Sequence, residues 1–103
     1  MNQLPRSFDY DLARVLLVDD NPTNRRILVL QTTSWGMKPI AAAGGPEALE
    51  MLKSGQDFDL AILDMQMPAM DGLTLASEIR KLRSPIQLPM VAAEFTAASF
   101  FPS

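Results

Sequence analysis

Cysteine and histidine are both absent from the 103 residues of this sequence. Without cysteine there can be no disulfide framework and no thiolate metal site. Without histidine, acid–base catalysis by an imidazole and histidine-ligated zinc are excluded as well. No apolar run reaches the ~18–20 residues that a membrane-spanning helix requires, so we expect no membrane contact. The N-terminus also lacks the basic-then-apolar order of a signal peptide, which makes a cytoplasmic location the default expectation.

An excess of positive charge is missing too. The net charge is −3, and charged residues make up 20% of the chain. A nucleic-acid surface would need a basic patch, so we expect no nucleic-acid partner. Hydrophobic residues make up 48%, which at this length is typical of one globular domain rather than two or a disordered tail.

Short apolar runs alternate with segments of helical spacing along the chain. A run that is apolar on both sides indicates a strand buried on both faces, as in a parallel sheet. The pattern therefore predicts an α/β fold, a doubly wound parallel sheet with right-handed crossovers. The expected strands cover residues 15–18, 38–42, 60–63 and 90–93, and the expected helices run from 22 to about 35, from 46 to 54 and from about 73 to 83.

The helix starts and their apolar faces are predicted from capping residues and residue spacing. Pro22 is tolerated in the first turn of a helix, and Thr23 is a suitable capping residue. Ile27 with Leu30, and Leu28 with Trp35, supply apolar positions at helical spacing in the first helix. The third helix is marked by Leu73, Ala76 and Ile79, which are spaced at i, i+3 and i+6.

Aspartates follow two of the expected strands where each strand ends. Asp19 and Asp20 close the first strand, and Asp64 closes the third. In an open parallel sheet the working site lies beyond the carboxyl ends of the strands, so these carboxylates converge if the two strands are neighbours. Like charges at close range raise each other's pKa, and a divalent cation resolves the repulsion. Carboxylates and a backbone carbonyl suit Mg²⁺.

Such a site suits phosphoryl transfer, because an aspartate can act as the nucleophile and form an acyl phosphate. The sequence has neither the GxxxxGK[ST] nor the GxGxxG pattern, so the phosphoryl group would come from another protein or a small donor. The alternative is that each aspartate is a turn former or a helix cap, which is the commoner role of a lone aspartate after a strand.

Two longer motifs surround these aspartates. Residues 15–22 read VLLVDDNP, and residues 60–72 read LAILDMQMPAMDG, with GGPEAL at 44–49 between them. Over roughly residues 14–91 the chain resembles the receiver domains of response regulators and, most of all, of hybrid histidine kinases. The resemblance implies a flavodoxin-like fold. It also implies a signalling phospho-acceptor in a two-component phosphorelay, rather than an enzyme that turns over an external substrate.

The resemblance also implies roles by position. Asp64 would take the phosphoryl group from a phosphohistidine on a histidine kinase or phosphotransfer protein. Asp20 would bind Mg²⁺ directly and Asp19 often through water, with Asp64 and the backbone carbonyl of Gln66 completing the protein ligands. Asp71 would cap the following helix and bind no metal.

The C-terminal end departs from the family pattern. Receivers place a serine or threonine after the fourth strand and a lysine after the fifth. Here Glu94 holds the hydroxyl position by ungapped counting, Thr96 would serve only if the strand ran longer, and no lysine follows Lys81. We expect a tail or linker at 1–12, a truncated receiver lacking the last βα unit at 13–93, and an atypical tail at 94–103. The exposed fourth-strand edge would then allow a homodimer. A shortened chain, a rearranged reading frame and true degeneracy stay open as explanations.

Two alternative functions remain at this point. The first is a degenerate receiver that is no longer phosphorylated and serves as a protein-interaction module. The second is a phosphohydrolase of the haloacid dehalogenase type, because residues 19–23 partly match its Asp-x-Asp-x-Thr signature. Among the remaining residues, Met65, Met67 and Met70 are expected to pack and shape the loop. Arg25–Arg26 are expected to form a solvated helix face, and contact with a kinase partner is the alternative.

Overall fold

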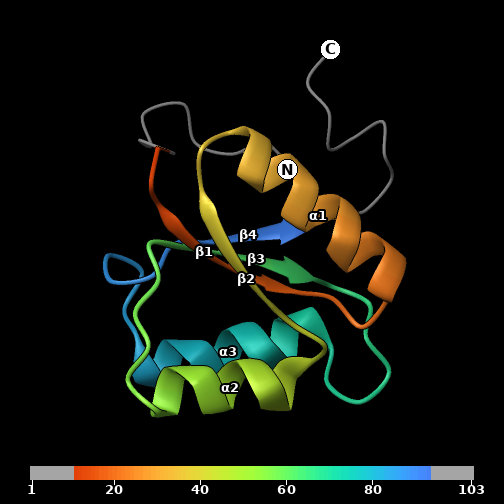
Figure 1. The fold of residues 1–103 in the computed structure, drawn as a ribbon. Helices are drawn as coiled ribbons and strands as arrows, with labels where there is room; N and C mark the ends of the chain where they lie inside the picture. The colour runs from red at the N-terminus through yellow and green to blue at the C-terminus, as the bar shows by residue number, and fades with distance from the viewer. Residues whose placement is uncertain (1–10, 94–103) are drawn as a thin grey trace.

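The computed structural model describes residues 11–93, which form a four-stranded parallel sheet with helices on both faces (Figure 1). The predicted order of strands and helices is confirmed, and with it the flavodoxin-like α/β fold. The strands are β1 (Arg14–Val18), β2 (Lys38–Ala42), β3 (Leu60–Asp64) and β4 (Met90–Ala93), and the helices are α1 (Pro22–Ser34), α2 (Gly45–Lys53) and α3 (Gly72–Leu82).

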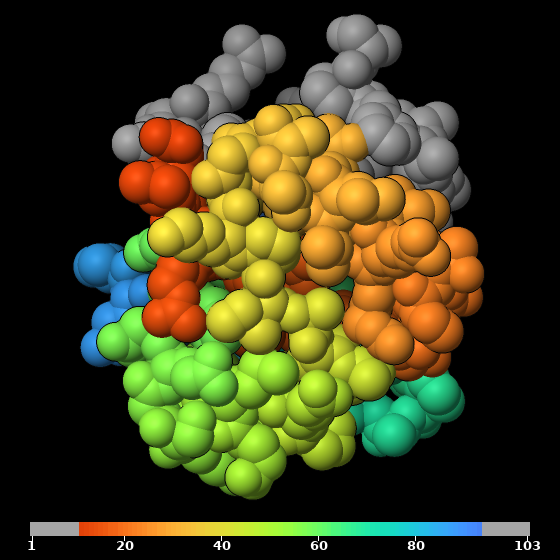
Figure 2. Space-filling view, viewed as in Figure 1, coloured from red at the N-terminus to blue at the C-terminus, as the bar shows by residue number. Residues whose placement is uncertain are grey.

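The strand order across the sheet is β2-β1-β3-β4. The chain therefore reverses direction across the sheet between β1 and β3, which lie side by side at the centre. Helix α1 covers one face, and α2 and α3 cover the other (Figure 1). In the space-filling view from the same side, β2 (yellow) lies between α1 (orange) and α2 (yellow-green) (Figure 2). This layering places the carboxyl ends of β1 and β3 together at one end of the sheet.

Both faces of β1 and β3 are buried, which explains their continuous apolar sequences. On the face covered by α2 and α3, Leu16 and Leu63 pack with a larger cluster that includes Leu75 and Ile79. On the opposite face, alternate strand residues pack beneath Leu28 of α1. Successive side chains of such a strand enter two different cores, so both of its sides are apolar. The alternation of apolar and polar residues that marks a half-exposed strand is therefore absent.

Three details of the helices differ from the predictions. Asn21, not Thr23, caps α1, since its side-chain oxygen accepts from the backbone N–H groups of Thr23 and Asn24. Pro22 then occupies the first helical position, where its missing N–H costs nothing. Leu30 and Leu73 do not face the core: they are 63% and 72% exposed. In α3 the buried stripe instead runs through Leu75 and Ile79.

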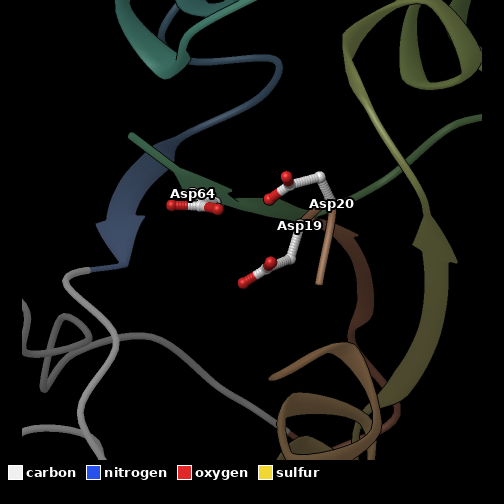
Figure 3. Close-up of side chains that lie close together, drawn as sticks. All are labelled: Asp19, Asp20 and Asp64. Carbon is white, nitrogen blue, oxygen red and sulfur yellow. The ribbon is translucent and has the colours of Figure 1, made fainter. Parts of the chain in front are cut away.

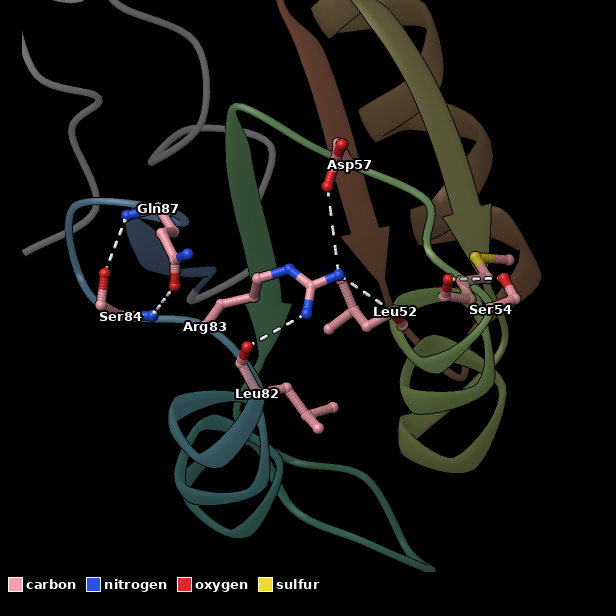
Figure 4. A network of polar contacts seen from close by, with 8 residues as sticks. Leu52, Ser54, Asp57, Leu82, Arg83, Ser84 and Gln87 are labelled. Atoms are coloured by element: carbon pink, nitrogen blue, oxygen red, sulfur yellow. Dashed lines mark hydrogen bonds and ion pairs between the residues drawn. The ribbon is translucent and has the colours of Figure 1, made fainter.

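The C-terminal ends of α2 and α3 are joined by Arg83 (Figure 4). Its Nη2 donates to the Leu52 carbonyl at 3.0 Å and its Nη1 to the Leu82 carbonyl at 3.0 Å. These carbonyls belong to the last turns of the two helices and lack partners within the helices themselves. An ion pair with Asp57 is longer, at 4.0 Å, and Asp57 is 88% exposed. Within residues 11–93, no helix is long and apolar enough to cross a membrane.

Candidate functional site

Three aspartates meet at the carboxyl ends of the two central strands. In the β1–β3 pairing, Val18 lies opposite Leu63, so Asp19 and Asp64 are the next residue along each strand. Each of Asp19, Asp20 and Asp64 offers one carboxylate oxygen, and these oxygens lie within 4.8 Å of one another (Figure 3). The expectation that the two strands are neighbours is confirmed, and the predicted convergence of the aspartates with it.

The three carboxylates differ in their surroundings. Asp19 is fully buried, and its Oδ1 accepts a hydrogen bond from the Asn21 N–H at 2.9 Å. Its other oxygen, Oδ2, is buried without a hydrogen-bond partner in the described part of the chain. Asp20 is exposed, and Asp64 is half-buried. The Asp64 Oδ1 accepts from the Gln66 N–H at 3.0 Å, which fixes the orientation of this carboxylate.

Burial raises the pKa of Asp19 from 3.8 to about 6, and the nearby carboxylates of Asp64 and Asp20 add to the rise. The hydrogen bond from Asn21 acts in the opposite direction but is outweighed. A carboxylate kept from water beside two others is costly to ionise. Without a positive charge between them, the three carboxylates repel one another.

A small divalent cation fits this arrangement on three counts. The donors are all oxygens, the ligand type that Mg²⁺ prefers. The Asp19 Oδ2 is a buried acceptor that lacks a donor, and a cation would satisfy it. One carboxylate is exposed and one half-buried, so the cluster is open to solvent on one side and a bound Mg²⁺ could keep several waters. The residues that can hold the ion are thus Asp19, Asp20 and Asp64.

Arg25 also belongs to this end of the sheet, which the sequence did not indicate. Its Nη1 donates to the main-chain carbonyl of Asp19 at 2.8 Å, and the residue is half-buried. The expectation of a solvated Arg25–Arg26 face is therefore wrong for Arg25, although Arg26 is exposed. A long side chain has many rotamers, so its fold-back onto a strand end leaves no signal in the residue pattern.

The loop after Asp64 is held by close packing. A Cβ on Gly72 would lie 2.7 Å from the Asp64 carbonyl oxygen and 2.5 Å from the Met65 Sδ, so only glycine fits there. Met67 is buried, and the Met70 sulfur lies against Gly45 at the start of α2, which confirms the packing role of these methionines.

Asp71 caps α3, as expected. Its Oδ1 accepts from the Thr74 N–H at 2.8 Å, and this bond holds the pKa of Asp71 below its usual range. The cap fixes where α3 begins and therefore the length of the loop that leads from Asp64 to the helix. The metal-ligand role expected for the Gln66 carbonyl stays a prediction.

Residues 15–99 match the family profile of the response regulator receiver domain. The chain belongs to this family. Similar curated proteins include the sensor histidine kinase CheAY of Helicobacter pylori, which is 44% identical over 79 residues, or 76% of this chain and 10% of that protein. Hybrid signal transduction histidine kinase L of Dictyostelium discoideum is 37% identical over 92 residues, or 87% of this chain and 5% of that protein. The receiver domain thus spans a tenth or less of these relatives.

Solved receiver structures resemble this one in fold. The response regulator TrrA of Thermotoga maritima, solved in complex with Mg²⁺–BeF, has a TM-score of 0.69 and 38% identity, covering 76% of this chain and 65% of that one. The chemotaxis response regulator CheY4 of Vibrio cholerae has a TM-score of 0.71 and 30% identity, covering 79% of this chain and 67% of that one. Membership of the receiver family replaces the phosphohydrolase alternative.

The predictions for the C-terminal part of the receiver fall on residues that the structure does not describe. Glu94 and Thr96, and the whole segment 94–103, lie outside residues 11–93, as do residues 1–10 of the expected tail or linker. The receiver site described above rests on β1, β3 and the loops that follow them.

Proposed function

We propose that this receiver domain accepts a phosphoryl group on the Asp64 carboxylate, donated by a phosphohistidine of a histidine kinase or phosphotransfer protein. The observation that carries the proposal is the meeting of three carboxylates at the ends of β1 and β3 in a chain of this family. The similarity to sensor and hybrid histidine kinases supports the class of partner. The proposal makes the domain a signalling acceptor in the cytoplasm, not an enzyme with an external substrate.

The roles of the side chains follow from their surroundings. The Asp64 Oδ1 is held by the Gln66 N–H, which leaves Oδ2 to attack phosphorus. The new oxygen–phosphorus bond forms as the phosphorus–nitrogen bond of the phosphohistidine breaks, and the imidazole nitrogen keeps the electron pair. Asp19, Asp20, Asp64 and the Gln66 carbonyl would hold Mg²⁺. When bound, Mg²⁺ offsets the negative charge that develops on the phosphoryl oxygens.

The extent and the assembly of the domain are part of the proposal. We take residues 13–93 as the receiver unit, with 1–12 and 94–103 as flanking segments. Within the described residues β4 pairs with β3 alone, so its outer edge is free for pairing in that part of the chain. A homodimer through this edge remains a prediction, and sedimentation of the full chain at several concentrations would check it.

The function is tested by incubating the full chain with acetyl phosphate and Mg²⁺, followed by intact-mass analysis. We expect one phosphoryl group on the wild type and none on Asp64→Asn. Asp57→Asn is a matched control, because Asp57 is an exposed aspartate away from the site, and this variant should be labelled like the wild type. Full labelling of Asp64→Asn would contradict the assignment. An unlabelled wild type that still binds Mg²⁺ would favour the interaction-module alternative.

A further inference from the structure

Arg25 donates its hydrogen bond to the main chain of the site. The Asp19 carbonyl that accepts from Arg25 Nη1 belongs to the peptide group that joins Asp19 to Asp20. The N–H of Asp19 still pairs with the Ala42 carbonyl of β2 at 3.2 Å, so the sheet holds the chain up to this residue. The next peptide lies beyond the strand, and the Arg25 guanidinium holds its carbonyl oxygen at 2.8 Å.

The orientation of this peptide sets the relative directions of two carboxylates. The Asp19 side chain has its own restraint, the hydrogen bond from the Asn21 N–H. The Asp20 side chain is exposed, so its direction depends on the backbone that carries it. A rotation of the peptide between them would swing Asp20 away from Asp64 while Asp19 stayed buried.

We propose that Arg25 is a positioning residue of the acidic site: it holds the Asp19–Asp20 peptide in the orientation in which the Asp20 carboxylate meets those of Asp19 and Asp64. The inference rests on the proposed function, because it concerns the same cation site. Arginine suits this role, since its guanidinium stays charged and its planar donors form stronger hydrogen bonds to a carbonyl than a neutral donor does.

The neighbouring Arg26 provides a matched control. It carries the same charge one residue further along α1, but its side chain is exposed. If Arg25 acted only through its charge, removing either arginine would strengthen cation binding, because a positive side chain repels Mg²⁺. If Arg25 acts through its hydrogen bond, only its own replacement matters.

The experiment measures Mg²⁺ affinity of the full chain by isothermal titration calorimetry, with urea unfolding to confirm that each variant is folded. We expect Arg25→Met to bind Mg²⁺ about three- to tenfold more weakly than the wild type, a loss of the size that one net hydrogen bond contributes. Arg26→Met should match the wild type. Arg25→Gln, polar but two atoms too short to reach the carbonyl, should behave like Arg25→Met and serves if the methionine variant fails to fold. Arg25→Lys, one atom shorter and still charged, should recover part of the affinity.

A second readout reports on the peptide itself. The amide resonance of Asp20 belongs to the peptide that Arg25 holds, so in metal-free protein it should move in Arg25→Met and Arg25→Gln and stay in place in Arg26→Met. Wild-type Mg²⁺ affinity in both Arg25→Met and Arg25→Gln would overturn the inference, and so would an equal loss in Arg26→Met. If the wild type itself binds no Mg²⁺, the proposed function fails. If the wild type binds and Asp20→Asn does not, the proposed site stands and the Arg25 variants alone decide.

Discussion

Replacing Asp19 with asparagine should stabilise the receiver domain when no divalent cation is present. Asp19 is fully buried, and its Oδ2 has no hydrogen-bond donor among residues 11–93. Asparagine keeps an oxygen for the Asn21 N–H and turns an amide group toward the other two carboxylates. The change therefore removes a buried negative charge without removing the hydrogen bond that orients the side chain.

The size of the effect follows from the pKa of Asp19, which burial raises from 3.8 to about 6. At about 1.4 kcal/mol per pKa unit, ionised Asp19 lowers the free energy of unfolding by about 3 kcal/mol above pH 6. We expect a gain of about 1–3 kcal/mol in Asp19→Asn, because an amide beside two carboxylates only partly replaces a protonated acid. For a domain of this size the midpoint of thermal unfolding should rise by roughly 4–8 °C per kcal/mol.

The pH dependence distinguishes this explanation from a simple packing effect. The folded state binds the Asp19 proton more tightly than the unfolded state does, so the stability of the wild type falls as the pH rises from about 3.8 to about 6. The advantage of Asp19→Asn should accordingly be largest above about pH 6 and should vanish or reverse in sign as the pH falls to about 4, where Asp19 of the folded wild type is protonated. Mg²⁺ should stabilise the wild type and leave the variant little changed, because only the wild type keeps the full set of carboxylates.

The assay is urea unfolding followed by circular dichroism, in EDTA and in Mg²⁺, at several pH values. Asp20→Asn is the matched control: Asp20 is exposed, so its replacement should change metal-free stability little. An Asp19→Asn variant that is less stable than the wild type in EDTA above about pH 7 would refute the reasoning. A gain that stays the same at every pH would refute it too.

Two further predictions concern the framework around the site. Gly72→Ala should cost about 1–3 kcal/mol of unfolding free energy, since the added Cβ would meet the Asp64 carbonyl oxygen at 2.7 Å. The same variant should bind Mg²⁺ more weakly, and a wild-type affinity by calorimetry would contradict this prediction. Arg83→Met should cost about 1–2 kcal/mol in urea unfolding, because the Leu52 and Leu82 carbonyls lose a charged donor, while Leu52 keeps the Gly55 N–H at 3.1 Å. Asp57→Asn should change stability by less than about 0.5 kcal/mol, because the pair is 4.0 Å long and Asp57 is 88% exposed. An effect equal to that of Arg83→Met would show that the ion pair dominates.

The central strands could be predicted because burial on both faces requires a continuous run of apolar residues. β1 and β3 are continuous apolar runs that stop at aspartate, and both the strands and the meeting of Asp19, Asp20 and Asp64 follow from that pattern. The unequal burial of the three carboxylates did not follow, because it depends on how the turn after β1 folds over Asp19.

The helices were harder to orient than to locate. Leu73 and Leu75 lie two positions apart in α3 and therefore on nearly opposite sides, so only one of them can face the core. Spacing alone selected Leu73, but packing against α2 and the sheet selects Leu75. At the start of α1, Pro22 was the usable signal: proline favours the first helical position, which makes Asn21 the cap.

The three carboxylates can meet only after β1 and β3 have paired during folding. The chain between these strands contains α1, β2 and α2, so the pairing of β1 with β3 closes a long loop, a slow and entropically costly step. A chain in which β1 has paired with β2 but β3 has not docked presents Asp19 and Asp20 without Asp64. Under the proposed function, a phosphoryl donor thus finds its acceptor beside a bound cation only in molecules whose sheet is already assembled. Newly made or partly unfolded copies would stay silent in the signalling pathway.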